Sequence, residues 1–243
     1  MSLVTAAIVL VSAIVQSMTG FGFAVLAVPL FALFWKPIDA VAISFILSTL
    51  CVVLLWQKVR RADRLPIVRP LFVAALVGLP FGIWALQRID LHVLRLAIGI
   101  VTLATVGIFG FASIRREPAS PAATPSTPLS LATGLVAGLL TGALSMPGPP
   151  VVMLLTGCGA SKASYRGTLT AFAILIYPVG LVALIVERLI TPAAMWQAFL
   201  QVPVLVLGIW LGNILHNAVS ERLFARMSLV LLALAGAVCF IPR

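Results

Sequence analysis

Two long apolar runs in this chain are each interrupted near their middle by residues that break a helix. The first contains Thr19-Gly20-Phe21-Gly22 and the second Pro147-Gly148-Pro149-Pro150, where a simple membrane-spanning helix would carry Leu, Ile or Val. Irregular backbone in hydrocarbon is tolerated only where it is buried in protein or lines a cavity. Two interrupted segments at corresponding positions of two halves are the best sequence indication of a transporter's binding site. The pattern therefore predicts a membrane transporter with its site between the breaks.

The composition excludes an ordinary soluble domain. Hydrophobic residues make up 62% of the chain and charged residues 9%, with a mean hydropathy of +1.21. A formal charge of +10 could suggest nucleic acid, but the basic residues stand singly or in short clusters between apolar runs. We interpret them as topology signals that face anionic lipid head groups, and we expect no nucleic-acid partner.

No residue pattern points to a metal or a cofactor. Cys51, Cys158 and Cys239 are widely spaced within or beside apolar runs, and they are best interpreted as small buried hydrophobic residues. His92 and His216 fall in predicted loops without metal-ligand spacing. We therefore expect neither a metal site nor a cofactor.

The first apolar run, Leu3 to Phe34, is longer than the ~20 residues that a spanning helix needs. Its break divides it into two pieces of about fourteen residues. Each piece would reach roughly 20 Å, short of the ~30 Å hydrocarbon core. This length favours a hairpin that enters the membrane and returns to the same side. A single overlong, tilted helix is the alternative.

The remaining apolar runs have the length of ordinary spans. They cover 38–56, 67–86, 93–111, 169–186, 194–215 and 223–241, and a second broken run covers 129–157. A stretch rich in Pro, Ala, Ser and Thr, residues 115–128, cannot form a packed core and predicts an extended linker. The chain thus divides into a first transmembrane repeat, 1–114, the linker, and a second transmembrane repeat, 129–243.

Short matches support a duplication. Ser17-Met18-x-Gly20 corresponds to Ser145-Met146-x-Gly148, and Gly82-Ile83-Trp84 corresponds to Gly208-Ile209-Trp210. Each pair lies roughly one half-length apart, in the same order and at the equivalent element.

The basic residues distinguish parallel from inverted repeats. If all eight segments span, the two sides carry nine and seven basic residues, which is almost no bias. If the broken segments are hairpins, one side collects eleven: Lys58, Arg60, Arg61, Arg64, Arg69, Arg115, Arg116, Lys162, Arg166, Arg222 and Arg226. The other side keeps five: Lys36, Arg88, Arg95, Arg188 and Arg243. The positive-inside rule favours this second arrangement, with the eleven-charge side cytoplasmic and both termini outside. The sequence thus predicts an all-α polytopic membrane protein of two inverted repeats, each a broken or hairpin first segment plus three transmembrane helices.

Both halves carry motifs with a family resemblance. The first has Gly20-x-Gly22, then Val28-Pro29-Leu30, then a small-residue span that begins Ala40-Val41-Ala42-Ile43-Ser44. The second has Gly134-x-x-x-Gly138-x-x-x-Gly142, then Gly148-Pro149-x-Val151-Val152, then Lys162 and Arg166. Over nearly its whole length the chain resembles the TauE/SafE family, the sulfite-exporter-like permeases.

The resemblance implies a multi-pass bacterial inner-membrane protein that exports a small sulfur-containing anion, such as sulfite, sulfoacetate or another organosulfonate. The chain departs from the family pattern at two places. Many members have a Gly-Gly-Gly run where this chain has Gly22-Phe23-Ala24, and its Pro147-Gly148-Pro149-Pro150 is more rigid than usual. These departures leave the choice among anions open.

A broken helix suits an oxyanion because free N–H groups at a helix N-terminus carry partial positive charge. Gly20, Gly22 and Gly148 would let the backbone approach the ligand without a Cβ in the way. The side chains that could donate further hydrogen bonds are Gln16, Ser17, Thr19 and Ser145. Gln16 could instead pair with backbone freed by the break, and both interpretations stay open. For Gly134, Gly138 and Gly142 we favour helix packing over ligand binding.

Arg166 is the candidate cation of the site. It opens the span that follows the second break, so its planar guanidinium could be presented to the anion. The alternative is an arginine that snorkels to the cytoplasmic head groups. Ser48, Thr49 and Thr170 lie in spans after the breaks and are weaker candidates, because such residues usually bond local carbonyls.

The acidic residues all fall in or beside predicted loops: Asp39, Asp63, Asp90, Glu117, Glu187 and Glu221. No predicted span holds a carboxylate of the kind that marks proton relays, or a group that could activate a nucleophile. We therefore expect a transporter and not an enzyme. An inside-negative potential drives an anion outward by about 2.3 kcal/mol per charge per 100 mV, so export by alternating access needs no coupled ion.

Two other interpretations stay open for the function. One is a channel-like pore for the same anions. The other is a non-transport membrane protein. The expected partners are a small anion and the lipid bilayer. A homo-oligomer formed through exposed Trp or Gly faces stays open, because the sequence does not establish one.

Overall fold

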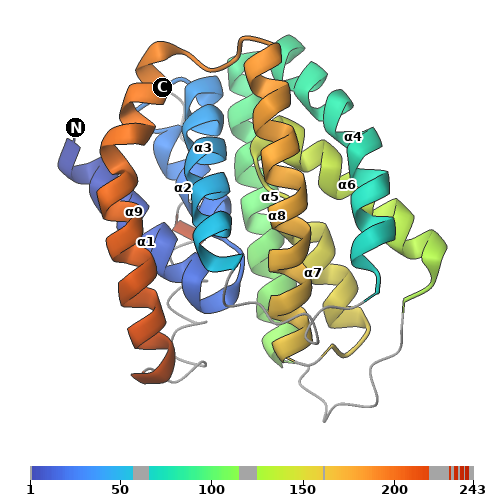
Figure 1. Ribbon diagram of the computed structural model, residues 1–243. Coiled ribbons are helices and arrows are strands. Elements are labelled where there is room, and N and C mark those ends of the chain that lie inside the picture. Colours follow the sequence, from blue (N-terminus) through green and yellow to red (C-terminus); the bar gives the residue numbers. More distant parts are fainter. Residues whose placement is uncertain are drawn as a thin grey trace.

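The computed structural model describes residues 2–56, 66–114, 125–160 and 162–218, with the positions 230, 233–234, 236–237 and 239–240. All regular structure within these residues is helical, which confirms the predicted all-α class (Figure 1). The helices are α1 (Ser2–Thr19), α2 (Phe23–Phe31), α3 (Pro37–Leu55), α4 (Val68–Arg88), α5 (Leu91–Ile114), α6 (Thr127–Leu144), α7 (Gly148–Gly157), α8 (Lys162–Val186) and α9 (Pro192–Ala218). Of these, α3, α4, α5, α6, α8 and α9 are long and apolar enough to cross a membrane.

The first predicted break is confirmed in the structure. Helix α1 ends at Thr19 and α2 begins at Phe23. Between them Gly20 and Gly22 have φ angles of +83° and +109°, the left-handed region that residues with a Cβ rarely adopt. The helices on the two sides of this break differ in length, however. The prediction of two pieces of about fourteen residues is wrong, because α1 has 18 residues and α2 has 9.

The second break covers 145–147 and overlaps the predicted Pro147-Gly148-Pro149-Pro150 only at Pro147. Helix α6 ends at Leu144, Ser145 adopts a left-handed φ of +59°, and α7 begins at Gly148. Pro149 and Pro150 therefore lie in the first turn of α7. Proline fits there because its missing N–H has no intrahelical acceptor to lose and its fixed φ suits a helix. The prolines start a helix in this chain and do not interrupt one.

The ordinary spans agree with the predicted runs, except that α8 starts at Lys162, seven residues before the predicted Leu169. Arg166 is therefore inside a helix. The predicted linker lies outside the described residues except for 125–128, and so does most of the predicted span 223–241.

Glycines allow α4 and α6 to pack with their backbones in contact. A Cβ built on Gly134 or Gly138 of α6 would overlap the carbonyl oxygens of Leu71 or Ala75 on α4. Gly78 of α4 approaches Leu135 O in the same way. This close approach is the packing role expected for the glycines of α6.

Helix α9 packs along α1 by a similar arrangement. A Cβ on Gly208 would lie 2.7 Å from Ala13 Cβ, and one on Gly212 would lie 2.8 Å from Ser17 Cβ. A late helix of each half thus packs on the first helix of the other half.

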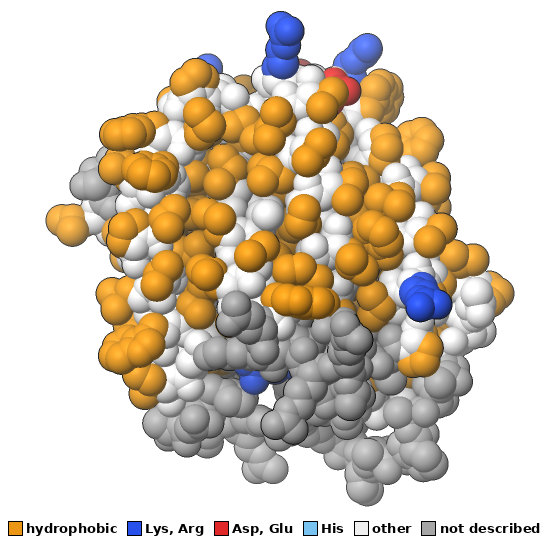
Figure 2. All heavy atoms as spheres, viewed as in Figure 1, with side chains coloured by type: hydrophobic (Ala, Val, Ile, Leu, Met, Phe, Trp, Pro, Cys, Tyr) orange, Lys and Arg blue, Asp and Glu red, His pale blue; other side chains and the backbone are white. Residues whose placement is uncertain are grey.

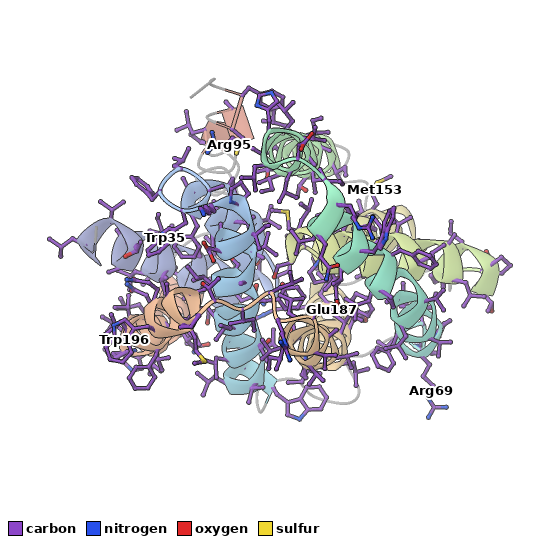
Figure 3. The ribbon with its side chains drawn as sticks, turned by 90° about the horizontal axis from the view of Figure 1, so that it is seen from above. Trp35, Arg69, Arg95, Met153, Glu187 and Trp196 are labelled. Atoms are coloured by element: carbon purple, nitrogen blue, oxygen red, sulfur yellow. The ribbon has the colours of Figure 1, made fainter. Side chains whose placement is uncertain are left out.

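The outer surface of the helix bundle is apolar. Hydrophobic side chains cover most of the face in Figure 2, and Lys and Arg side chains stand at its upper edge. Trp84, Trp196 and Trp210 are each 59% exposed, and Trp196 projects away from the bundle when it is seen from above (Figure 3). Such a surface belongs in lipid, and the protein is a multi-pass membrane protein.

The hydrophobic core lies between the short helix α2 and the spanning helices α3 and α8. Its largest fully buried side chains include Phe23 and Phe31 of α2, Phe45 of α3 and Phe172 of α8.

Candidate functional site

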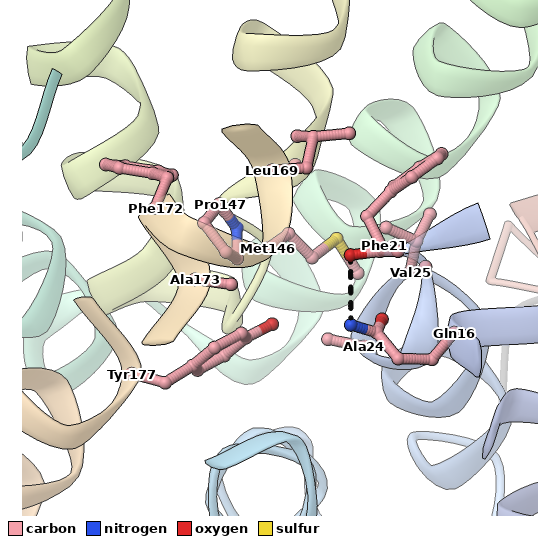
Figure 4. Close-up of a pocket in the computed structure, with 13 residues that line it drawn as sticks. Gln16, Phe21, Ala24, Val25, Met146, Pro147, Leu169, Phe172, Ala173 and Tyr177 are labelled. Carbon is pink, nitrogen blue, oxygen red and sulfur yellow. Dashed lines mark hydrogen bonds between the residues drawn. The ribbon is translucent and has the colours of Figure 1, made fainter. Parts of the chain in front are cut away.

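The two helix breaks meet at one small buried cavity (Figure 4). Its lining residues are Gln16, Gly20, Phe21, Gly22, Ala24, Val25, Met146, Pro147, Gly148, Leu169, Phe172, Ala173 and Tyr177. None of these side chains carries a charge. The cavity has a volume of about 20 Å³, enough for about one water molecule. The structure thus brings together Gln16, Gly20, Gly22 and Gly148 of the predicted site residues.

Phe21 and Gly148 form the contact between the breaks. A Cβ built on Gly148 would lie 3.0 Å from Phe21 Cδ2, tighter than most side-chain contacts. The absence of a side chain at Gly148 therefore leaves room for the Phe21 ring.

Gln16 holds the backbone on both sides of the first break. Its side chain is 4% exposed. Its Nε2 donates to Gly20 O at 3.2 Å, and its Oε1 accepts from Phe23 N at 3.0 Å. The glutamine thus pairs with backbone freed by the break and also lines the cavity, so the structure combines the two interpretations of the sequence.

The N-terminus of α2 supplies backbone donors to the cavity wall. The first N–H groups of a helix have no intrahelical acceptor. That of Phe23 donates to Gln16, and the next two belong to Ala24 and Val25, which line the cavity.

Helix α7 has two prolines in its first turn. Pro149 and Pro150 have no N–H group, so Gly148 and Val151 alone among its first four residues can donate. In α2 the N–H groups of Phe23 and Leu26 already donate to Gln16 Oε1 and Gly22 O, so Ala24 and Val25 remain, and the two helix starts offer similar numbers of donors.

Ser17 and Thr19 do not line the cavity. Ser17 Oγ donates to Ile209 O of α9 at 3.2 Å, which ties α1 to α9. Thr19 Oγ1 donates to Val15 O at 2.8 Å and is also paired with Phe21 O, which closes the turn after α1. Both hydroxyls thus stabilise the first break from outside the cavity.

Arg166 also lies outside the cavity lining, beside the first break. Its Nη2 donates to Ser17 O at 2.6 Å, so a cation meets carbonyls at the C-terminal end of α1, where the helix dipole is negative. A Cβ on Gly20 would lie 2.7 Å from Arg166 Cγ. The neighbouring Tyr165 packs edge-on against Phe21, with ring centroids 6.3 Å apart. The first break is thus held against α8.

Tyr177 is a cavity residue that the sequence analysis missed. Its hydroxyl donates to Ser145 O at 3.0 Å, where α6 ends in its left-handed residue. The signal was present, because the chain has 2 tyrosines and this one interrupts an apolar span with a polar group that needs a partner. Ser145 itself lies behind Tyr177, and its side chain is not part of the cavity lining.

No group of three or more His, Cys, Asp or Glu side chains that could hold a metal ion occurs within the described residues. The cavity offers neutral hydrogen-bond donors in an apolar wall. This chemistry suits the binding of a small ligand rich in acceptor atoms.

Comparison with known proteins identifies one family. A family model described as Sulfite exporter TauE/SafE matches residues 4–239, nearly the whole chain. No curated protein and no solved structure matches the sequence significantly.

Proposed function

Because the chain belongs to the sulfite exporter TauE/SafE family, we propose that it exports sulfite or an organosulfonate such as sulfoacetate across a bacterial inner membrane. The observation that carries this proposal is the meeting of the two helix breaks at one buried cavity. In the proposal, Gln16, Gly20, Gly22 and Gly148 form the wall that receives the anion. Arg166 is the cation next to that wall.

The chemistry of the cavity supports an anionic substrate. Sulfite and sulfonate head groups present several acceptor oxygens and no nitrogen donors. The first turn of α2 and the Gln16 amide are donors, and the lining has no carboxylate to repel the anion. The apolar side chains of Leu169 and Phe172 exclude water, which strengthens each polar contact inside.

In this proposal Ser17, Thr19 and Ser145 do not contact the anion but hold the backbone at the two breaks in place. Their side chains and carbonyls fix the two breaks, and Ser17 O holds the Arg166 guanidinium. An entering anion is a stronger acceptor than a peptide carbonyl. We propose that it replaces Ser17 O on Arg166 as the cavity opens.

The path of the chain supports two inverted repeats. Figure 1 places the α4–α5 and α8–α9 connections at the same, upper end of the bundle. Parallel repeats of spanning segments would put these two connections at opposite ends. The reciprocal packing of α4 on α6 and of α9 on α1 is also what a twofold relation between the halves requires.

The basic residues then give the orientation. The end with the α4–α5 and α8–α9 connections carries Arg88 and Arg188, which belong to the side with five charges. The opposite end carries the starts of α4 and α8, with Arg69, Lys162 and Arg166 of the side with eleven charges; the other eight lie outside the described residues. The positive-inside rule makes that end cytoplasmic.

The size of the cavity favours a carrier over a pore. A volume of about 20 Å³ is too small for sulfite. Binding therefore requires the two breaks to separate, and closure on the other side would complete an alternating-access cycle. The contacts that must give way are those between Phe21 and Gly148 and between Arg166 and Ser17.

Sulfite exchange in proteoliposomes tests the proposal. Vesicles loaded with unlabelled sulfite should take up radiolabelled sulfite by counterflow that saturates, and an imposed potassium diffusion potential should drive net flux. A flux that is linear with concentration and shows no counterflow would identify a pore. Net flux that does not change with the imposed potential would contradict uncoupled anion export. The absence of any sulfite or sulfoacetate flux would overturn the proposed function.

A further inference from the structure

Tyr177 presents a rigidly held hydroxyl to the cavity. The side chain is 5% exposed. Its ring packs edge-on against Phe45, with centroids 5.6 Å apart and an interplanar angle of 86°. Figure 4 shows its hydroxyl directed into the space between the breaks, across from Gln16. Packing thus fixes the ring, and only the O–H bond remains free to turn.

Two further hydroxyls lie beside that of Tyr177. These are Ser48 of α3 and Ser145, the residue directly after α6. Ser48 is 1% exposed and Ser145 is fully buried. Among the described residues neither Oγ has a partner in hydrogen-bonding geometry. Thr49, next to Ser48 on the same helix, instead bonds Phe45 O at 2.7 Å.

Buried hydroxyls without partners are rare in native proteins, because leaving one unpaired is destabilising. Three hydroxyls converge here, from α3, from α8 and from the C-cap of α6; the Tyr177 oxygen is the acceptor nearest to hand for the two serines, and neither Oγ meets it in good hydrogen-bonding geometry. An oxyanion supplies several acceptors at once. Its oxygens accept a hydrogen bond from the Tyr177 hydroxyl, while the Ser48 hydroxyl turns to donate to the phenol oxygen.

We infer that Tyr177, supported by Ser48, is the substrate-selecting hydrogen-bond donor of the site. This inference rests on the proposed export of a sulfur oxyanion. In the loaded state the Tyr177 hydroxyl turns from Ser145 O to an oxygen of the anion. Ser48 donates to the Tyr177 oxygen, which strengthens the phenol as a donor through a hydrogen-bonded chain. Ser48 is thus a positioning residue, and Tyr177 contacts the substrate.

This arrangement also explains how an anion can leave. Neutral hydroxyls recognise the oxygens without adding a second positive charge to that of Arg166. A transport site must bind strongly enough to load and weakly enough to release. When the anion departs, the Tyr177 hydroxyl donates its hydrogen bond to the Ser145 carbonyl again.

The experiment compares Tyr177→Phe with Tyr165→Phe. Both substitutions remove one buried phenol hydroxyl, and Tyr165 is the matched control because it lies outside the cavity lining. Sulfite-dependent thermal stabilisation of the purified protein and the KM of sulfite counterflow are measured. Tyr177→Phe should raise the half-saturating sulfite concentration about tenfold or more, as expected for the loss of one hydrogen bond to a charged group. Tyr165→Phe should leave it unchanged.

Ser48→Ala and Ser44→Ala form a second matched pair. Both hydroxyls are buried on α3 without a partner among the described residues, but only Ser48 lies beside Tyr177. Ser48→Ala should raise the KM for sulfite with little change in maximal rate or in the melting temperature without ligand. Ser44→Ala should not change the KM. If Tyr177→Phe does not fold, the comparison of Ser48→Ala with Ser44→Ala tests the role of the hydroxyls on its own.

The outcomes separate the inference from the proposed function. Saturable sulfite binding that is equal in wild type, Tyr177→Phe and Ser48→Ala overturns the role of the hydroxyls and leaves the transporter standing. Equal KM increases in the test and control variants also overturn it, because the effect would then be structural. A wild-type protein that neither binds nor moves sulfite or sulfoacetate overturns both.

Discussion

The Phe21 ring lies directly against Gly148, so that a Cβ on the glycine would sit 3.0 Å from Phe21 Cδ2. These residues are far apart in the sequence and belong to different breaks. Their contact closes one side of the cavity. In the proposed cycle it must open to admit the anion.

Gly148→Leu should therefore abolish sulfite counterflow, because the new side chain competes with Phe21 for the same space. Shortening the partner should restore part of the flux, so we expect Phe21→Ala combined with Gly148→Leu to be more active than Gly148→Leu alone. Full activity of the single variant in proteoliposomes would show that the contact does not take part in transport.

Gly138→Ala should strongly destabilise the protein. Its Cβ would overlap Ala75 O of α4, and backbone atoms cannot move aside as a side chain can. Overpacking of this kind typically costs about 1–3 kcal/mol. Gly107→Ala is the control, because a Cβ there meets nothing within 4 Å. Thermal unfolding in detergent should show a lower midpoint for Gly138→Ala only, and equal midpoints would refute the backbone contact.

Gln16→Leu should destabilise the first break, because Gly20 O and Phe23 N would both lose their partner in a buried place. Each unpaired group costs about 1–3 kcal/mol. The control is Gln201→Leu, which removes a bond to the side chain of Thr5 and not to the backbone. We expect a larger fall in the unfolding midpoint for Gln16→Leu. A smaller fall would mean that Gln16 does not hold the break.

Arg166→Ala should lower the rate of sulfite counterflow about tenfold or more, since it removes the proposed cation and the bond to Ser17 O. Arg166→Lys should be intermediate, because lysine keeps the charge but lacks the planar fork. Arg95→Ala is the control, as Arg95 also donates to a carbonyl, Ala32 O at 3.0 Å, away from the cavity. Equal losses in both alanine variants would reduce Arg166 to a helix-capping role.

The sequence predicts the breaks well where local geometry decides them. Gly20 and Gly22 predict a break because glycines loosen a helix, and the structure gives both of them the positive φ angles of the turn. The second break overlaps its prediction only at Pro147, because prolines interrupt a helix from within but fit the first turn of a new one. That distinction depends on where the preceding helix ends, at Leu144, which no short motif marks.

The cavity could be predicted only in part, because tertiary contacts complete it. Tyr177 faces the breaks because of the rotation of α8, which Phe45 and Ser145 fix from two other helices. Arg166 bonds a carbonyl 149 positions earlier in the chain. Local patterns identify residues that can bind an anion, but packing decides which of them meet.

The most direct test of the account is sulfite-dependent thermal stabilisation of the purified protein, in wild type, Gly148→Leu and Gly157→Leu. Gly157 is the matched control, because it lies on the same helix, α7, and has open space around it. The account predicts that sulfite or sulfoacetate stabilises the wild type and Gly157→Leu, whereas acetate does not, and that Gly148→Leu loses the effect. Stabilisation that survives in Gly148→Leu would place the anion elsewhere and contradict a site between the two breaks.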